Sequence, residues 1–139
     1  MYCRRGSKSS GFARISSPDH DPSMPDDCLF CKIVTGEIPS TVVLDRENVF
    51  AFRDIAPAAP VHVLIVPKRH IGDVRDLKAD DGDVVIEMFQ AANEIATSEG
   101  IAESGYRMLF NIGRDAGQTV FHLHMHLVGG RPLGGVGPG

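Results

Sequence analysis

His122-Leu123-His124-Met125-His126-Leu127-Val128 is the stretch of this 139-residue chain that says most about its fold. Histidines alternate with apolar residues, which is the period of a β-strand, because successive side chains of a strand point to opposite faces. We expect the apolar residues to pack into a core and the three histidines to share the other face. That face then carries groups whose protonation changes near neutral pH.

Three interpretations compete for this histidine face. One is a solvated strand surface, which accounts poorly for three of the chain's six histidines lying so close together. A second is a metal site that uses all three imidazoles, but positions i and i+4 of a flat strand lie ~13 Å apart. The third is nucleophilic catalysis, in which a neutral imidazole attacks an electrophilic phosphorus while a neighbouring imidazole handles the phosphate oxygens or the leaving-group proton.

The loop before the histidines favours the third interpretation. Asp115-Ala116-Gly117-Gln118-Thr119 consists mostly of small residues and is suited to present backbone N–H groups to an anion. Imidazoles that follow an anion-binding loop indicate chemistry on a phosphate.

Composition limits the class of protein. Hydrophobic residues make up 42% and charged residues 23% of the chain, which is typical of a single globular domain. No apolar run approaches the ~18 residues of a membrane helix. The formal net charge of −4 weighs against binding to nucleic acid or to a membrane surface. We therefore expect a cytoplasmic protein whose partner is a small molecule.

The two ends of the chain differ from its middle. Residues 1–27 are rich in Ser, Pro, Gly and charge, so we predict a disordered extension there. Its early basic residues resemble a transit peptide, and organelle targeting stands as the alternative to a solvated extension. We expect the folded domain to span residues 28–131 and residues 132–139 to form a flexible tail.

Periodicity predicts the elements of that domain. A short helix through Leu29 is capped by Asp26 or Asp27 and stops at Gly36, and a longer helix is capped by Asp80 and ends at Gly100. Strands are expected at residues 41–44, 49–53, 61–66, 106–111 and 119–128. Their short connections favour an α+β fold with a five-stranded antiparallel sheet. The apolar stripe from Val84 to Ile95 suits packing on this sheet and suits a dimer interface equally well.

Residues 122–128 resemble the His-φ-His-φ-His-φ-φ signature of the histidine-triad nucleotide-binding proteins, φ being apolar. Residues similar to that family's also occur at 52–55, 60–62, 65–70, 111, 117–120 and 129–131, so the resemblance spans residues 28–131. Pro67-Lys68-Arg69-His70 and the Gly-Gly-Arg after the triad favour the nucleoside phosphoramidase branch (the HINT branch) over the dinucleoside polyphosphate hydrolases. The resemblance implies a HIT-like fold and a homodimer with the long helix and a sheet edge at its interface.

The resemblance also implies catalytic roles. His124 would be the nucleophile that carries the nucleoside monophosphate as a covalent adduct. His126 would contact the α-phosphate and assist proton transfer, and His62 would orient the triad from behind. Thr119 would hold a phosphate or leaving-group atom. A satisfied core histidine is the alternative for His62.

The nucleotide-binding residues are implied in the same way. Gly117 and Gln118 belong to the phosphate-binding loop with Thr119, Asn111 would face the phosphate or ribose, and Asp54 would accept hydrogen bonds from the ribose hydroxyls. An ordinary turn acid is the alternative for Asp54. The base pocket would be lined by apolar residues that a plain core explains equally well, namely Leu29, Phe30, Ile33, Phe52 and Ile55.

Cys28 and Cys31 form a Cys-x-x-Cys pair. The pair alone is weak evidence, because a structural zinc site needs about four ligands. Some bacterial relatives complete such a site with the histidine of the Pro-Lys-x-His segment and the first histidine of the triad, which here are His70 and His122. We therefore predict a structural Cys2His2 zinc site that leaves His124 free for attack. Two small buried residues, or a redox pair, are the alternatives.

The function that follows is hydrolysis of the P–N bond of a purine nucleoside 5′-phosphoramidate, with AMP or GMP as the nucleotide. The reaction would pass through a nucleotidyl-histidine and requires no catalytic metal, since backbone N–H groups and imidazoles meet the phosphate charge. One alternative is hydrolysis of dinucleoside polyphosphates or adenylyl sulfate. Another is a nucleotide-binding scaffold or regulatory protein whose catalysis is incidental.

Overall fold

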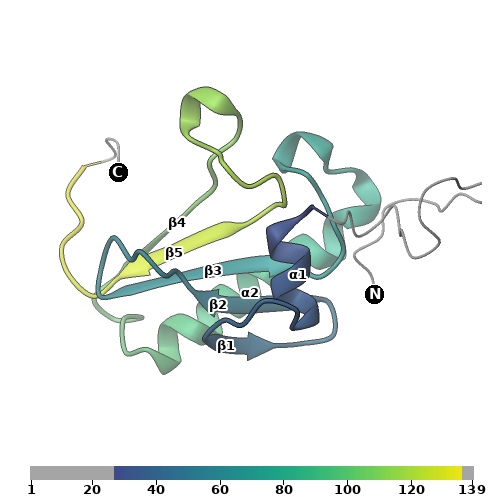
Figure 1. Cartoon of the computed structure of the whole chain (residues 1–139). Coiled ribbons are helices and arrows are strands. Elements are labelled where there is room, and N and C mark those ends of the chain that lie inside the picture. The colour runs from purple at the N-terminus through teal and green to yellow at the C-terminus, as the bar shows by residue number, and fades with distance from the viewer. Residues whose placement is uncertain (1–26, 136–139) are drawn as a thin grey trace, which may run out of the picture.

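The computed structural model describes residues 27–135, so the predictions made for residues 1–26 and 136–139 lie outside the described part of the chain (Figure 1). Its centre is a five-stranded antiparallel sheet of order β1-β2-β3-β5-β4, which confirms the predicted α+β class. The strands are β1 (Val42–Asp45), β2 (Val49–Arg53), β3 (Val61–Pro67), β4 (Tyr106–Leu109) and β5 (Met125–Gly129). The helices are α1 (Leu29–Thr35) and α2 (Gly82–Ser98), with short 3-10 turns at Val74–Asp76, Ala79–Asp81 and Arg114–Ala116.

The two helices cover opposite faces of the sheet, and the alternation along β2 and β3 explains why. Val49, Ala51 and Ile65 belong to the core under α2, whereas their neighbours Phe50 and Phe52 belong to the core under α1. Every residue of β3 is buried because both of its faces are covered. The sheet is therefore the middle of three layers.

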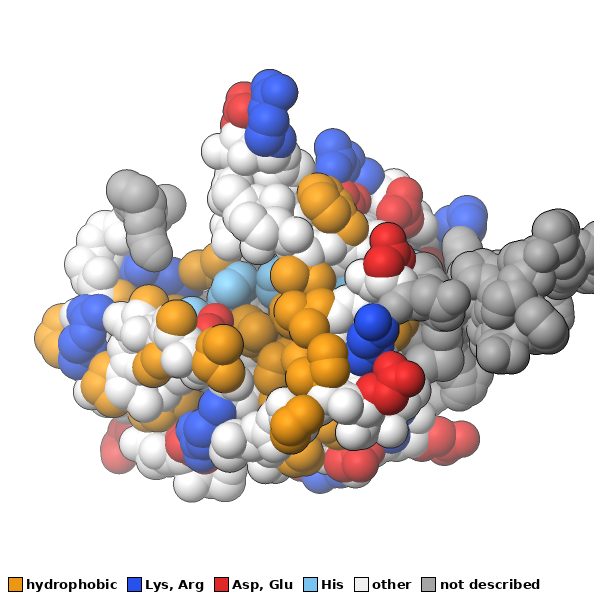
Figure 2. Space-filling model, in the orientation of Figure 1, with side chains coloured by type: hydrophobic (Ala, Val, Ile, Leu, Met, Phe, Trp, Pro, Cys, Tyr) orange, Lys and Arg blue, Asp and Glu red, His pale blue; other side chains and the backbone are white. Residues whose placement is uncertain are grey.

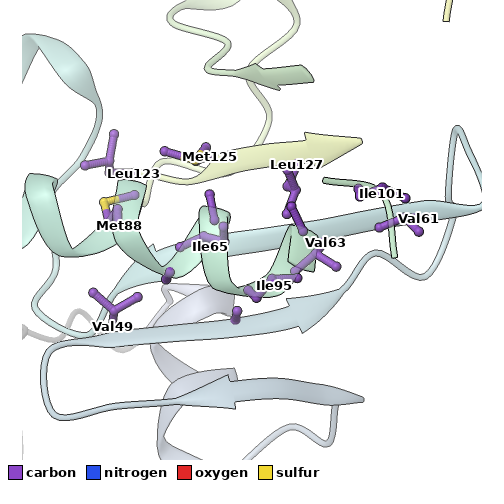
Figure 3. Close-up of a cluster of buried hydrophobic side chains, with 14 of the residues drawn as sticks. Val49, Val61, Val63, Ile65, Met88, Ile95, Ile101, Leu123, Met125 and Leu127 are labelled. Atoms are coloured by element: carbon purple, nitrogen blue, oxygen red, sulfur yellow. The ribbon is translucent and has the colours of Figure 1, made fainter. Parts of the chain in front are cut away.

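The apolar stripe of α2 packs on the protein's own sheet. Met88 and Ile95 are fully buried against β3 and β5 side chains such as Ile65 and Leu127 (Figure 3). Among the described residues, no helix has the length and hydropathy needed to cross a membrane. The stripe is thus part of the monomer core.

The last strand is shorter than predicted, because β5 begins at Met125 and residues 119–124 precede it. β3 pairs with β5 as far as Ile65 with Met125, and β4 as far as Leu109 with His126, so neither neighbour pairs with the chain before Met125. The N–H of Leu123 instead donates to the carbonyl of Ile71 at 2.6 Å. The predicted apolar core of Leu123, Met125 and Leu127 is nevertheless fully buried.

Both predicted helix caps are wrong, whereas the predicted stop of α1 is confirmed. Cys28 caps α1, because its Sγ accepts a hydrogen bond from the N–H of Cys31 at 3.2 Å. The chain before α2 forms a 3-10 turn, and the carboxylate of Asp81 turns away to the N–H of Lys78 and to Arg69. Gly36 ends α1 with φ 88°, a left-handed conformation that favours glycine.

Candidate functional site

Histidine side chains gather where β5 begins, beside the N-terminus of α1. They form two groups, one on each side of His124. The cysteine–histidine cluster consists of Cys28, Cys31, His70 and His122, and the carboxylate–histidine cluster consists of Asp54, His62 and His126. Figure 2 shows histidine side chains at the surface next to a patch of apolar side chains.

Hydrogen bonds set the tautomers in the carboxylate–histidine cluster. The backbone N–H of Ala58 donates to Nδ1 of His62 at 3.0 Å, so the proton of a neutral His62 lies on Nε2. That Nε2 lies 2.9 Å from Nδ1 of His126 and 3.3 Å from a carboxylate oxygen of Asp54. Nδ1 of His126 therefore accepts, and His126 carries its own proton on Nε2. This bond accounts for the closeness of the two rings.

His124 has the opposite arrangement of proton and lone pair. Its Nδ1 lies 2.8 Å from the carbonyl of His122, and because a carbonyl only accepts, Nδ1 carries the proton. The lone pair of a neutral His124 is then on Nε2. Burial lowers the pKa of His124. Burial, reinforced by His124 and His62, lowers the pKa of His126 to about 4, so both rings are neutral at pH 7.

The apolar residues predicted for the base pocket divide into two sets. Phe30, Ile33 and Phe52 are buried between α1 and the sheet, and the ring of Phe30 meets that of His124 edge-to-face at 5.0 Å. Leu29 is 43% and Ile55 is 97% exposed, which places both at the surface. The first set thus combines a core role with direct contact to the histidines.

The loop before the histidines is held from inside by Gln118. Its carboxamide accepts from the N–H of Gly113 at 2.8 Å and donates to the carbonyls of Val120 at 3.2 Å and Gly72 at 3.4 Å. The buried Gln118 side chain is therefore committed to the loop. Gly117, with φ 88°, and Thr119 are exposed.

The four residues predicted to hold zinc are brought together from three parts of the chain. Nδ1 of His122 lies 3.2 Å from Sγ of Cys28 and 3.5 Å from Sγ of Cys31, and Nδ1 of His70 lies 3.5 Å from Sγ of Cys31. All four ligand atoms lie within 4.8 Å of one another. Two sulfurs and two imidazole nitrogens at such separations suit a tetrahedral zinc ion.

The protonation of this cluster also suits a metal. Nε2 of the fully buried His122 lies 2.8 Å from the carbonyl of Pro67, so it carries the proton and Nδ1 turns a lone pair toward the thiols. A hydrogen bond with Cys31, and then burial, raises the pKa of the Cys28 thiol. Without a metal that thiol is protonated, so metal binding would release a proton.

Sequence reasoning missed two arginines. Arg107 and Arg131 line a cleft of about 240 Å³ together with His62, Asn111, His126 and Leu133. The signal that could have found Arg107 is the register of the sheet. Arg107 pairs with Val128 and Leu109 pairs with His126, so the side chains of Arg107 and His126 lie on one face of the sheet. A lone arginine on a predicted strand does not reveal that register.

Comparisons with known proteins agree with this geometry. Residues 35–133 match the family model of the HIT domain. The chain is 49% identical over 111 residues to the purine nucleoside phosphoramidase of Escherichia coli (strain K12), which covers 80% of this chain and 93% of that protein. The HIT family hydrolase of Legionella pneumophila Philadelphia 1 is 48% identical with a TM-score of 0.78, over 81% of this chain and all of that one. A histidine triad nucleotide-binding protein of Candida albicans is 32% identical with a TM-score of 0.68, over 79% and 86%.

Proposed function

The chain belongs to the HIT domain family and is a hydrolase of that family, and we propose that it cleaves the P–N bond of purine nucleoside 5′-phosphoramidates. One observation supports this reaction above the others. The hydrogen bonds leave a lone pair on Nε2 of His124 and a proton on Nε2 of His126, on adjacent rings 5.1 Å apart. A nucleophile beside a proton donor is what cleavage of a P–N bond requires.

The proposed reaction has two steps. His126 takes up a proton as the anionic substrate binds. Nε2 of His124 then attacks the α-phosphorus, the P–N bond breaks, and the departing nitrogen takes the proton from Nε2 of the charged His126. Water next attacks the phosphorus of the nucleotidyl-His124, giving up a proton to His126, and the bond to His124 breaks. The products are an amine and a nucleoside monophosphate, and His126 releases the proton that it took from water, so both histidines return to their starting state.

The surrounding residues would bind the nucleotide. We place the base against Phe30, Ile33 and Phe52, with Leu29 and Ile55 at the rim. The carboxylate of Asp54 would bind the ribose hydroxyls, although one of its oxygens also accepts from the N–H of Ala56 at 2.9 Å. Asn111, Gly117 and Thr119 would face the phosphate, and Gln118 would contribute backbone only. The charge on phosphorus is then met by N–H groups and imidazoles, without a catalytic metal.

The cysteine–histidine cluster is proposed to hold a structural zinc ion. Cys28, Cys31, His70 and His122 would be its ligands and would tie the start of α1 to the segments that follow β3 and precede β5. Such an ion supplies folding free energy. Because the carbonyl of His122 accepts from His124, the same residue would also hold the nucleophile in place.

We further propose that the protein is a homodimer in the cytoplasm. β4 is an edge strand of the sheet, and Ile86 and Phe89 of α2 are 57% and 38% exposed although both are large and apolar. A second copy that covers these side chains would remove them from water. Light scattering of the purified protein at several concentrations distinguishes a dimer from a monomer.

The test of the reaction compares three nucleotides with one enzyme. We expect fast turnover of an adenosine 5′-phosphoramidate of a simple amine and slow turnover of diadenosine tetraphosphate and adenylyl sulfate. Faster hydrolysis of either of the latter would assign the alternative substrate class. Tight binding of AMP without turnover of any of the three would favour a nucleotide-binding scaffold.

A further inference from the structure

A basic cleft lies on the side of His126 that faces away from the apolar residues of α1. We define it by the residues His62, Arg107, Asn111, His126, Arg131 and Leu133, which enclose about 240 Å³. The ring of His124 contacts Phe30, the ring of His126 contacts those of His124 and His62, and His126 lines the cleft. The order from one side to the other is therefore apolar pocket, nucleophile, proton donor and basic cleft.

No carboxylate of residues 27–135 neutralises the two cleft arginines. Within residues 27–135, neither Arg107 nor Arg131 has a carboxylate within ion-pair distance. Every other arginine in that range has one, namely Arg46, Arg53, Arg69, Arg75 and Arg114. Two unpaired guanidinium groups in one small cleft indicate a site for an anion.

Backbone carbonyls orient both guanidinium groups without cancelling their charge. Arg107 donates to the carbonyl of Gly134 at 2.7 Å and to that of Gly135 at 3.4 Å, which holds the segment after β5 beside β4 (Figure 1). Arg131 donates to the carbonyl of Ala58 at 2.7 Å and to that of Pro132 at 2.9 Å. A guanidinium has five N–H donors, so each retains donors for a ligand.

Arg131 is also connected to the catalytic histidines. The Ala58 residue that accepts from Arg131 donates its own N–H to Nδ1 of His62, which in turn contacts His126. Arg131 is therefore bonded to Ala58, the first residue of the hydrogen-bonded series that sets the tautomer of His126. This places the cleft within the reacting site rather than apart from it.

We propose that the basic cleft is the leaving-group subsite and that Arg107 and Arg131 select leaving groups that carry a negative charge. The inference rests on the proposed function, because the group expelled from phosphorus takes the proton of His126 and so departs on the side where the cleft opens. The shared chemistry of the preferred leaving group is an anion near the scissile bond. The carboxylate of an amino acid bound through its nitrogen would supply it, and so would the next phosphate of a polyphosphate.

The experiment uses a matched pair of substrates, the adenosine 5′-phosphoramidates of glycine and of glycinamide, which differ in one charge. The kcat/KM ratio of the first to the second is measured for wild type, Arg107→Gln, Arg131→Gln and the control Arg46→Gln. Because the two amines differ in basicity, the change of this ratio on substitution is the readout, not its value. We expect each cleft variant to lower the ratio by about tenfold through KM, and the control to keep the wild-type ratio.

Three outcomes separate the subsite from the reaction. An unchanged ratio in both cleft variants, with the glycinamide compound still hydrolysed, would overturn the subsite and leave the proposed function standing. If wild type hydrolyses neither compound, the proposed function fails, and the ratio of their dissociation constants in the same four proteins tests the subsite instead. If the cleft variants lower turnover of diadenosine tetraphosphate but leave the glycine to glycinamide ratio unchanged, the anion is a phosphate rather than a carboxylate.

Discussion

The cysteine–histidine cluster and the carboxylate–histidine cluster use the same residue type from the same short segment, yet they are suited to different tasks. His122 is fully buried, and one of its ring nitrogens is hydrogen-bonded to a backbone carbonyl while the other faces two thiols. His126 is half-buried, with one ring nitrogen on His62 and the other free to meet a ligand beside a cleft. The partner of each ring nitrogen, more than the histidine itself, therefore determines whether a site is suited to bind metal or to move protons.

His124 connects the two clusters. It donates to the backbone carbonyl of His122 and contacts the ring of His126. A rigid metal-binding cluster on one side would keep the proposed nucleophile in place, while the other side would supply the proton. Substitutions on each side of His124 can break this division of roles.

The largest expected effect is the loss of turnover in His124→Ala. Removal of a nucleophile usually costs several orders of magnitude, so we expect kcat to fall by about 10³-fold or more. Steady-state turnover of an adenosine 5′-phosphoramidate measures it. AMP binding and the circular dichroism spectrum serve as controls and should remain close to those of wild type. Retention of more than a tenth of the wild-type rate would show that the nucleophile lies elsewhere.

The second prediction concerns the metal. Freshly purified protein should contain about one equivalent of zinc, and Cys31→Ala should lose it and unfold more readily, by about 3 kcal/mol. Elemental analysis and denaturant unfolding with and without a chelator make the measurement. Zinc well below one equivalent, together with unaltered stability of Cys31→Ala, would assign these cysteines to ordinary packing.

A smaller effect is expected for His62→Gln, because we propose that His62 is a positioning residue that acts through His126. The variant should lower kcat by about tenfold to a hundredfold and leave AMP affinity close to wild type. Loss of the neighbouring imidazole should also raise the pKa of His126, since His62 contributes to lowering it. The limb of the kcat–pH profile that reports the protonation of His126 should then move to higher pH. A lower kcat with an unmoved profile would indicate a purely structural role.

The smallest effect is a pH dependence of stability. Unfolded histidine takes up a proton near pH 6.5, whereas folded His126 does so only near its pKa of about 4. Between these values the unfolded state binds more protons, so the free energy of unfolding should fall as the pH falls through this window. The partial exposure of His126 reduces the contribution to about 1 kcal/mol.

The matched variant for this measurement is His126→Gln. Urea unfolding of both proteins at several pH values between 4 and 7 gives the difference in slope, which cancels the other titrating groups. Wild type should lose stability more steeply than the variant as the solution is acidified. Parallel pH profiles would mean that His126 is not held neutral by the fold.

Local sequence patterns correctly predicted which face of a segment is buried and where a helix ends. Alternation placed Leu123, Met125 and Leu127 in the core, and Gly36 marked the end of α1. The start of β5 could not be found in the same way, because it is set by where pairing with β3 and β4 ends rather than by any residue of β5. The thiol cap of α1 was missed because Cys28 is not an ordinary cap residue.

The candidate site depends on contacts between distant parts of the chain, and local sequence patterns do not predict which residues those contacts bring together. The pairing of Cys28 and Cys31 with His70 and His122 came from resemblance alone, and the structure brings their ligand atoms together. Gln118 was expected to bind the nucleotide as part of its loop, and the structure shows its side chain bonded within that loop. The stripe on α2 suited two interpretations, and the structure packs it on the sheet. The roles of the site residues and the compartment remain predictions.

The reaction is tested most sharply by trapping the intermediate. Enzyme mixed with an excess of adenosine 5′-phosphoramidate is quenched within one turnover, digested and examined by mass spectrometry, with His124→Ala as the control. We expect the wild-type peptide to gain one adenylyl group on His124 and the His124→Ala peptide to gain none. Turnover with no adduct on any histidine, or an adduct on His126 or His122 instead, would contradict the proposed reaction.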